Sequence, residues 1–466
     1  MISRLNFGVL ATLAAAVFFL CGFSGSNPSQ ANRSRIAVPA DPILVTAAPA
    51  YEPLADIAHG KERFPEGAHL LIFHAAHSES LLPEFFASAD ANVSFDGTTV
   101  LFSGKKNAND PWQIWELTLA DHTTRKLVFA DTDLIRPFYL PGYRIAYAKR
   151  TSSGFQIETA SDEGNDKQQL TYISSSAVPV DVMQDGRILF ESGFPLGTAG
   201  TPELYLVYPD GSGVESYRCD HGHARWGGHQ LVSGPHAGDV IITHGRSLGR
   251  FTSPLATEVA IAAPAAEYEG SLAETPSGAW FVTARANGNS RFGVMLLRPG
   301  AAALQPFFSS RDNHLIEPVV VAPRTVPKRH PTGLHEWTTA NLLALDVRRS
   351  RDGKLDATPT AVRLEAQDGT GNIVTMGFAP IEADGSFYVK TPADRPIHFV
   401  LLDRNGVTLR AERGWFWIRK GEQRICVGCH AGPEQAPENR VPQVLLRTTV
   451  PVDLSGATSV TAAGGH

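Results

Sequence analysis

Cysteine is scarce in this chain of 466 residues. Four are present: Cys21 near the N-terminus, Cys219 on its own, and Cys426 and Cys429 within one short motif. An exported protein that uses disulfides for stability has an even set of cysteines spread over its loops. A stabilising disulfide framework is therefore not expected.

Positive charge is not in excess either. Lys and Arg number 41 against 47 for Asp and Glu, which gives a net charge of −6 and a pI near 6.2. A protein that binds a polyanion needs clustered Lys and Arg to neutralise phosphates. We therefore expect no nucleic acid among the partners.

The N-terminus carries a short apolar run. Arg4 supplies positive charge before the run from Phe7 to Leu20, and Ser29-Gln30-Ala31 resembles a cleavage site. The run is too short and too close to the N-terminus for a good bilayer span. Residues 1–31 are thus predicted to be a signal peptide, and the protein to be periplasmic or extracellular.

Two alternatives to cleavage remain open. In a lipoprotein Cys21 would be acylated, but Leu20 is bulky where a lipobox has a small residue. An uncleaved leader would anchor the chain, and this is the one contact with a membrane that we expect.

Helical periodicity is missing between about Leu70 and Val321. Short β-branched and aromatic segments alternate there with turn residues. One unit runs from Asn92 to Ser103 and a similar one from Val178 to Phe190, each through an Asp-Gly pair that suits a tight hairpin turn. These segments predict repeated antiparallel strands.

The units recur at roughly 40 to 50 residues, the length of one four-stranded propeller blade. They resemble TolB-like repeats, and predict a propeller of about five to seven blades over residues 66–325. Residues 32–65 are expected to precede it as an N-terminal segment. A last blade would be closed by Leu70–Phe73 pairing with Pro318–Val321. A two-sheet sandwich is the alternative, because strand count alone does not separate the two folds.

A second β-rich region follows a linker at residues 326–340. It is predicted to be a small antiparallel sandwich over residues 341–453, with a disordered tail at 454–466. The whole chain is thus predicted to be all-β. The expected strands of the sandwich are Leu342–Val347, Ala361–Glu365, Ile373–Ala379, Ser386–Lys390, Ile397–Leu402 and Val407–Glu412.

Cys426-Val427-Gly428-Cys429-His430 has the pattern of covalent haem c attachment. Two thiols at this spacing add to the two vinyl groups on one edge of the macrocycle, and the adjacent imidazole then lies below the iron. We predict one haem c held by Cys426 and Cys429, with His430 as an axial ligand. A thioredoxin-like redox pair would need a βαβ setting, and zinc a second ligand pair at a compact spacing.

The residues around this motif resemble a known family. Pro380–Phe387, Pro392–Pro396, Leu402–Gly406 and Trp415–Glu422 are similar to the haem-bearing middle domain of the hydrazine synthase alpha subunit. The resemblance is best supported over residues 340–450, and implies a propeller before the haem domain. It also implies that Trp415 and Trp417 pack on the haem or line the domain interface.

The family's full-length subunit has a further C-terminal haem domain, whereas this chain has one Cys-x-x-Cys-His motif. A second haem is therefore not expected, nor the internal electron route of hydrazine synthesis. If the protein is an enzyme, we expect a haem c oxidoreductase with another reaction.

The second axial position of the iron decides between electron transfer and small-molecule chemistry. No Met or His follows His430 before the terminal His466. Met376, His335 and His398 are candidates upstream, but Met376 and His398 lie in apolar strand patterns typical of core or surface residues. An open iron is the alternative.

A second cluster of ligand-type residues is Cys219-Asp220-His221-Gly222-His223, which is followed by three further histidines. Cys219, His221 and His223 are candidate zinc ligands, or would supply groups to the haem face. Solvated loop histidines around a structural cysteine are the favoured alternative, because no compact paired spacing is present.

These observations predict an exported monohaem c-type cytochrome for electron transfer or one-electron redox chemistry. Its partner would be a redox protein or a small-molecule substrate. One alternative is an oxidoreductase acting on a small nitrogen or oxygen species at open iron. Another is a propeller that binds a protein, with the haem secondary.

Overall fold

The computed structural model describes residues 41–57, 61–74, 77–218, 220–275, 277–298, 300–349, 353–428 and 440–456. The predicted signal peptide, Cys219, Cys429 and His430 lie outside these residues. Strands dominate the described part, where the helices are α1 (Leu54–Ile57), α2 (Gln443–Arg447) and the 3-10 turn Gly234–His236. None of these helices is long and apolar enough to cross a bilayer.

Residues 43–320 form six four-stranded antiparallel sheets. Five of them are meanders of consecutive strands, in which each strand pairs with the next one along the chain. The predicted all-β class and the four-stranded repeat unit are confirmed. The strands of these five sheets are β4 (Ala87–Val93), β5 (Thr99–Lys105), β6 (Gln113–Thr118) and β7 (Thr124–Val128); β8 (Leu134–Leu140), β9 (Arg144–Thr151), β10 (Gly154–Ser161) and β11 (Gln168–Gln169); β12 (Val178–Val182), β13 (Ile188–Phe194), β14 (Thr201–Val207) and β15 (Glu215–Ser216); β16 (Trp226–Gln230), β17 (Val240–Thr243), β18 (Leu248–Phe251) and β19 (Val259–Ile261); β20 (Glu267–Glu274), β21 (Trp280–Arg285), β22 (Gly293–Leu297) and β23 (Gln305–Phe308).

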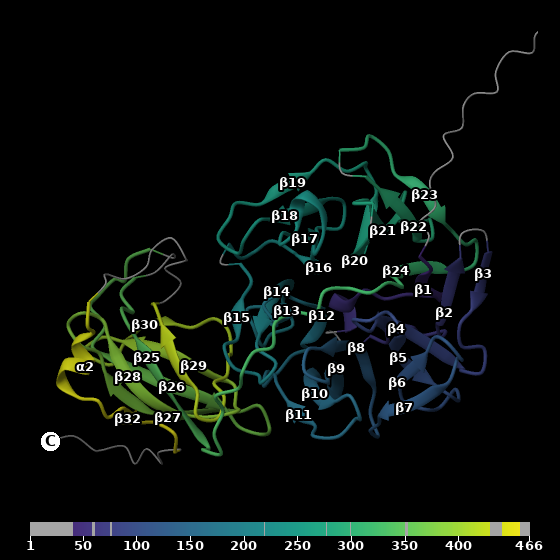
Figure 1. Ribbon diagram of the computed structural model, residues 1–466. Coiled ribbons are helices and arrows are strands. Elements are labelled where there is room, and N and C mark those ends of the chain that lie inside the picture. Colours follow the sequence, from purple (N-terminus) through teal and green to yellow (C-terminus); the bar gives the residue numbers. More distant parts are fainter. Residues whose placement is uncertain are drawn as a thin grey trace, which may run out of the picture. The chain divides into compact units, whose positions relative to one another are not determined.

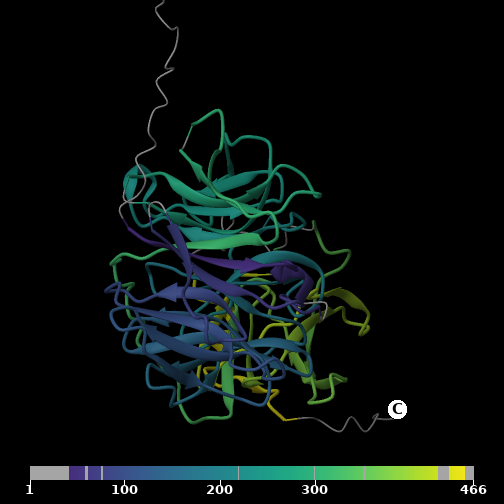
Figure 2. The same ribbon diagram turned by 90° about the vertical axis from the view of Figure 1, so that its right-hand side faces the viewer.

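The sixth sheet joins the two ends of the propeller (Figure 1). Its order is β24 (His314–Val320), β1 (Ile43–Ala48), β2 (His69–His74) and β3 (His77–Ser80). In Figure 2 the purple N-terminal strands lie beside the green strand of this sheet. The predicted direct pairing of Leu70–Phe73 with Pro318–Val321 is wrong, because β1 lies between β2 and β24 and all six of its residues are buried.

The second region is a sandwich of two four-stranded sheets. One has the order β31 (Gln423–Cys426), β25 (Thr339–Ala344), β28 (Phe387–Pro392) and β32 (Val452–Asp453), and the other β27 (Ile373–Pro380), β26 (Ala361–Gln367), β29 (Ile397–Leu402) and β30 (Thr408–Ala411). Every second residue of β25 and β26 is buried, and Leu342 and Leu364 belong to one core between the sheets.

The sandwich is not purely antiparallel as predicted. β31 runs parallel to β25, and β32 runs parallel to β28. Parallel neighbours need a long connection, and here most of the domain separates β25 from β31 in sequence. Leu454, the first residue of the predicted tail, is buried, and its amide donates to the Lys390 carbonyl at 2.8 Å. Residues 457–466 of that tail lie outside the described residues.

Trp417 and Arg419 connect the sandwich to the propeller. The Trp417 side chain is fully buried in a core that contains Phe190 and Tyr205 of the propeller. The Arg419 Nε donates to the backbone carbonyl of Asp210 at 2.9 Å. These contacts attach the segment before the Cys-x-x-Cys-His motif to the sheet formed by β12–β15.

Candidate cofactor site

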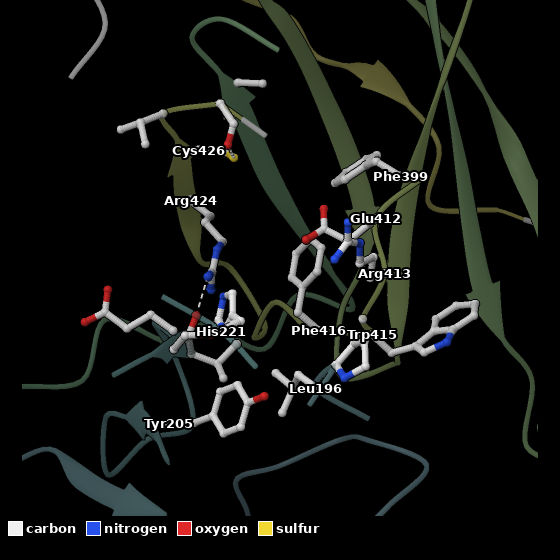
Figure 3. Close-up of a pocket in the computed structure, with 18 of the residues that line it drawn as sticks. Leu196, Tyr205, His221, Phe399, Glu412, Arg413, Trp415, Phe416, Arg424 and Cys426 are labelled. Carbon is white, nitrogen blue, oxygen red and sulfur yellow. Dashed lines mark hydrogen bonds between the residues drawn. The ribbon is translucent and has the colours of Figure 1, made fainter. Parts of the chain in front are cut away.

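A cavity of about 850 Å³ lies at the end of β31, beside Cys426 (Figure 3). Leu196, Tyr205 and His221 line it from the propeller, and Trp415 and Cys426 line it from the sandwich. Its volume lies within the range of small-molecule and cofactor sites, roughly 300–1,000 Å³. A site of cofactor size is thus built from both domains.

Several aromatic side chains form part of the cavity wall. Phe194 and Tyr205 come from the propeller, and Phe399, Trp415 and Phe416 from the sandwich. Such rings bury a large apolar area and exclude water from the space that they enclose. A flat, mainly apolar macrocycle such as haem fits this lining.

Cys426 is the last residue of β31, opposite Ala344 of β25. Its side chain is half-buried, and burial raises the pKa of its thiol. A thiol held in its neutral form is a poor nucleophile or thiolate ligand. The surroundings of Cys426 therefore disfavour the thiolate that a thioredoxin-like redox centre needs.

Gly428 allows the motif to turn closely against the end of β25. Its φ is +146°, and a Cβ on this residue would lie 2.5 Å from the Asp346 carbonyl oxygen. A side chain here would strain the backbone and collide with it. Cys429 and His430 follow directly but lie outside the described residues.

Arg424 supplies a cationic group to the cavity. One end of its guanidinium donates to the Val214 carbonyl, drawn as a dashed line in Figure 3. The other end, Nη1, is buried without a hydrogen bond to any described residue, and the Glu422 carboxylate is 3.7 Å from it. A buried guanidinium N–H without an acceptor is costly, and a carboxylate in the cavity, such as a haem propionate, would satisfy it.

Of the two tryptophans implied by the family resemblance, Trp415 lines the cavity and Trp417 does not. Trp415 stacks on His398 with ring centroids 4.1 Å apart and an interplanar angle of 11°. His398 Nε2 is in turn 2.6 Å from a carboxylate oxygen of Glu365. This stack fixes the orientation of the Trp415 ring in the cavity wall.

The three upstream residues considered as iron ligands do not line the cavity. Met376 is buried in the sandwich core, and His335 stacks on Trp337 at 4.9 Å. His398 lies behind Trp415. The fold therefore brings none of them to the site.

The cluster around Cys219 is divided by the fold. Asp220 and His221 line the cavity, whereas His223 is exposed and Cys219 lies outside the described residues. His221 and His223 do not share any group of three metal-ligating side chains within the described ranges. A zinc ion held by Cys219, His221 and His223 stays a prediction.

The three histidines that follow this cluster pair with carboxylates elsewhere in the propeller. His229 is between Asp181 and Glu274, His236 is beside Asp239, and His244 pairs with Glu258. These residues do not line the cavity.

His221 is held by two residues that sequence reasoning missed. Its Nδ1 is 2.7 Å from Oε2 of Glu203, a side chain buried within β14. Its ring stacks on Phe194 with a centroid distance of 4.1 Å and an interplanar angle of 12°. The only sequence signal for Glu203 is a carboxylate inside an otherwise apolar strand.

The matches to known proteins agree with this architecture. Residues 349–431 match the family model of the hydrazine synthase alpha subunit middle domain. Hydrazine synthase subunit alpha of Kuenenia stuttgartiensis is 33% identical over 57 residues, which are 12% of this chain and 7% of that protein. The aligned part is therefore a small fraction of the relative's length.

The solved hydrazine synthase structure shows a similar fold over more of the chain. Kuenenia stuttgartiensis hydrazine synthase matches with a TM-score of 0.76 over 88% of this chain and 72% of that chain, at 16% identity. TolB from Acinetobacter baumannii matches with a TM-score of 0.46 over 60% of this chain and 67% of that chain, at 14% identity. The resemblance seen in the residues around the motif is confirmed: residues 349–431 belong to the hydrazine synthase alpha subunit middle-domain family.

Proposed function

We propose that the cavity holds one haem c, attached through Cys426 and Cys429 with His430 as an axial ligand. The observation that carries this proposal is the cavity of about 850 Å³ with several aromatic side chains and Cys426 in its wall. The protein is then an exported monohaem c-type cytochrome that performs electron transfer or one-electron redox chemistry. When bound, the haem supplies a one-electron redox centre at its iron.

The residues of the chain set the properties of that centre. Phe399, Trp415 and Phe416 exclude water, which lowers the local dielectric and favours the less charged state of a buried group. Arg424 acts in the same direction, because its positive charge disfavours the additional positive charge of a ferric haem, and it offers an N–H to an acidic substituent of the cofactor. Hydrophobic enclosure and charge together are the means by which a protein tunes a reduction potential.

The location and partners follow from the same proposal. The leader at residues 1–31 exports the chain to the periplasm or beyond, where c-type haem attachment takes place. A redox partner protein or a small-molecule substrate exchanges electrons with the centre. A zinc ion at Cys219, His221 and His223 is a separate, weaker proposal.

A second candidate function is an oxidoreductase that acts on a small nitrogen or oxygen species at open iron. The family match favours it, because the matched relatives are named hydrazine synthases. Hydrazine synthesis itself is not proposed, since the aligned sequence is 7% of that relative.

The test is to produce the full chain together with a haem-maturation system and to measure covalent haem. We expect haem that stays on the denatured polypeptide, at one per chain, with the spectrum of a doubly thioether-linked haem. Replacing Cys426 and Cys429 by Ser should abolish it, whereas Cys219→Ser is the matched control and should retain it. A wild-type protein without covalent haem would overturn the proposal.

A further inference from the structure

We infer that His74, His77 and Glu79 form a binding site for a zinc ion on the hairpin between β2 and β3 (Figure 1). One ligand atom from each side chain lies within 4.8 Å of the other two. Within the part of the chain that the structure describes, this is the one group of three such side chains. The hairpin belongs to the sheet that joins the two ends of the propeller, and the inference does not depend on the haem proposal.

The strand register places the three side chains on one face of the hairpin. His74 pairs directly with His77, and Ile72 pairs with Glu79. Side chains alternate between the two faces of a strand, so these four residues project from the same face. His74 and Glu79 are diagonal neighbours, and a carboxylate oxygen of Glu79 is 3.8 Å from His74 Nε2. The hairpin therefore gathers all three ligands from a segment of six residues.

The β2 strand is held on both of its faces. Ile72, on the same face as the ligands, is buried in an apolar core with Phe102 of β5. On the opposite face Phe73 is buried, and its ring stacks on Phe308 of β23 with centroids 3.7 Å apart. His74 follows directly on this anchored backbone. A ligand whose backbone is fixed beforehand loses less freedom when a metal binds, which favours binding.

The ligand atoms are not occupied by hydrogen bonds. The 3.8 Å between His74 and Glu79 exceeds hydrogen-bond length, and neither they nor His77 form a hydrogen bond with a described residue. The two imidazole rings stack on each other instead, with centroids 5.1 Å apart. His229 and His244, in contrast, are paired with carboxylates. Each neutral ring at the hairpin thus keeps a nitrogen lone pair for a metal.

The set of donor atoms is one that zinc prefers. Two imidazole nitrogens and a carboxylate oxygen are known as zinc ligands in sites that leave the fourth tetrahedral position to water. Zinc bonds of this kind place neighbouring donor atoms about 3.3 Å apart. Rotation of the side chains closes the difference from 4.8 Å, because His74 is 38% exposed and Glu79 is 56% exposed. Mg²⁺ and Ca²⁺ prefer oxygen ligands and do not suit this set.

The zinc ion links β3 to β2. β3 is the edge strand of its sheet, and all four of its residues are exposed. His74 lies on β2, whereas His77 and Glu79 lie on β3, so the ion bridges the two strands. A metal that binds only the paired strands stabilises their pairing. Bound zinc should therefore protect the backbone amides of β3 from hydrogen exchange.

The experiment measures zinc binding to the metal-free full-length chain by equilibrium dialysis and calorimetry, with zinc chloride as the probe. His77→Ala removes one ligand, and Glu79→Gln removes the charge of another with little change of shape. His69→Ala is the matched control, because His69 is also an exposed histidine of this hairpin but does not belong to the group. Zinc bound elsewhere, for example by thiols, is the same in every variant, so differences between variants report this site.

We expect the wild type and His69→Ala to bind one more zinc ion per chain than His77→Ala. Glu79→Gln should bind about tenfold or more weakly, because even the loss of a residue that supports a ligand costs about 10–100-fold in affinity. An excess of Mg²⁺ should not compete. Zinc should slow hydrogen exchange in β3 of the wild type and of His69→Ala, but not in β3 of His77→Ala.

Equal zinc binding by the wild type and His77→Ala, in number and affinity, would overturn the inference. Zinc binding by Glu79→Gln with the affinity of the wild type would overturn the three-ligand site in the same way. Circular dichroism of each variant checks that the fold is kept, and Glu79→Gln provides the test if His77→Ala does not fold.

Discussion

The indole Nε1 of Trp417 donates a hydrogen bond to the backbone carbonyl of Gly211, 2.8 Å away. Trp417 precedes the Cys-x-x-Cys-His motif, whereas Gly211 lies in the turn between β14 and β15 of the propeller. The indole is fully buried and packs with Phe190 and Tyr205. Tyr205 also lines the cavity, so the same contact that joins the domains supports one wall of the site.

Replacing Trp417 should destabilise the protein and loosen the attachment of the sandwich. Trp417→Ala removes a large buried side chain, a class of change that costs about 3–5 kcal/mol. Trp417→Phe keeps most of the packing but leaves the Gly211 carbonyl unpaired, at a cost of about 1–3 kcal/mol. Urea unfolding followed by fluorescence and circular dichroism measures both changes.

The exposed Trp337 provides the control for this series, because its side chain is 58% exposed. Trp337→Ala should change the free energy of unfolding by less than about 0.5 kcal/mol. Equal losses for Trp417→Ala and Trp337→Ala would contradict the packing role of Trp417.

Gly428→Ala should impair covalent haem attachment. A Cβ at this position would lie 2.5 Å from the Asp346 carbonyl oxygen, on a backbone with φ of +146°. The segment must move to relieve this contact, and the Cys426 thiol moves with it. We expect a several-fold lower ratio of haem to protein on denaturing gels. Val427→Ala, at a 45% exposed neighbour, should attach haem normally.

Local signals predicted much of the fold. The Asp-Gly turns and alternating apolar residues placed most strands of the sandwich, and Ile397–Leu402 has the predicted bounds. The sequence did not predict β1, because its partners β2 and β24 are far away in sequence and no hairpin turn connects it to them. The parallel pairing of β25 with β31 was missed for the same reason, since pairing across a whole domain leaves no local pattern.

The residues of the candidate site also fall into those that the sequence signals and those that only the structure identifies. Cys426 and His221 were singled out from the sequence because their residue types and spacing carry chemistry. Glu203 and Phe194 were not, since an acidic or aromatic residue in a strand has no distinctive spacing until the fold places it beside His221. The residues that orient a functional side chain could therefore be identified only from the structure.

The stability of the propeller should depend on pH through His229. Burial alone would lower the pKa of His229, but the Asp181 and Glu274 carboxylates outweigh it and raise the pKa to about 10. The pKa in the unfolded chain is near 6.5. The stabilisation of the folded state by the charged His229 ring is therefore complete below pH 6.5 and is lost as the pH rises to 10.

His229→Gln should therefore lower the free energy of unfolding by about 3 kcal/mol at pH 6 and by much less at pH 10. Urea unfolding at the two pH values provides the measurement. His69→Gln, at an exposed position of β2, is the control and should show no such dependence. A loss that is equal at both pH values would mean that His229 acts through packing and not through charge.

Ionisation of Glu191 should destabilise the folded protein, whereas ionisation of an ion-paired carboxylate stabilises it. Its side chain is 4% exposed and forms no salt bridge with any described residue. Desolvation, followed by the nearby charge of Glu269, raises its pKa from 4.5 to about 8. The folded state then binds a proton that the unfolded chain releases between pH 4.5 and 8, so stability falls as the pH rises through this range.

Glu191→Gln keeps the shape of the neutral carboxyl group but cannot ionise. We expect little change in the free energy of unfolding at pH 5 and a more stable protein than wild type at pH 9, because the buried negative charge is no longer formed. Glu66→Gln, at an exposed residue, should leave the pH profile unchanged. If Glu191→Gln were less stable than wild type at pH 9, Glu191 would be ionised at a stabilising site, such as beside a bound cation. The pH profile of unfolding therefore separates a buried neutral acid from a buried ligand.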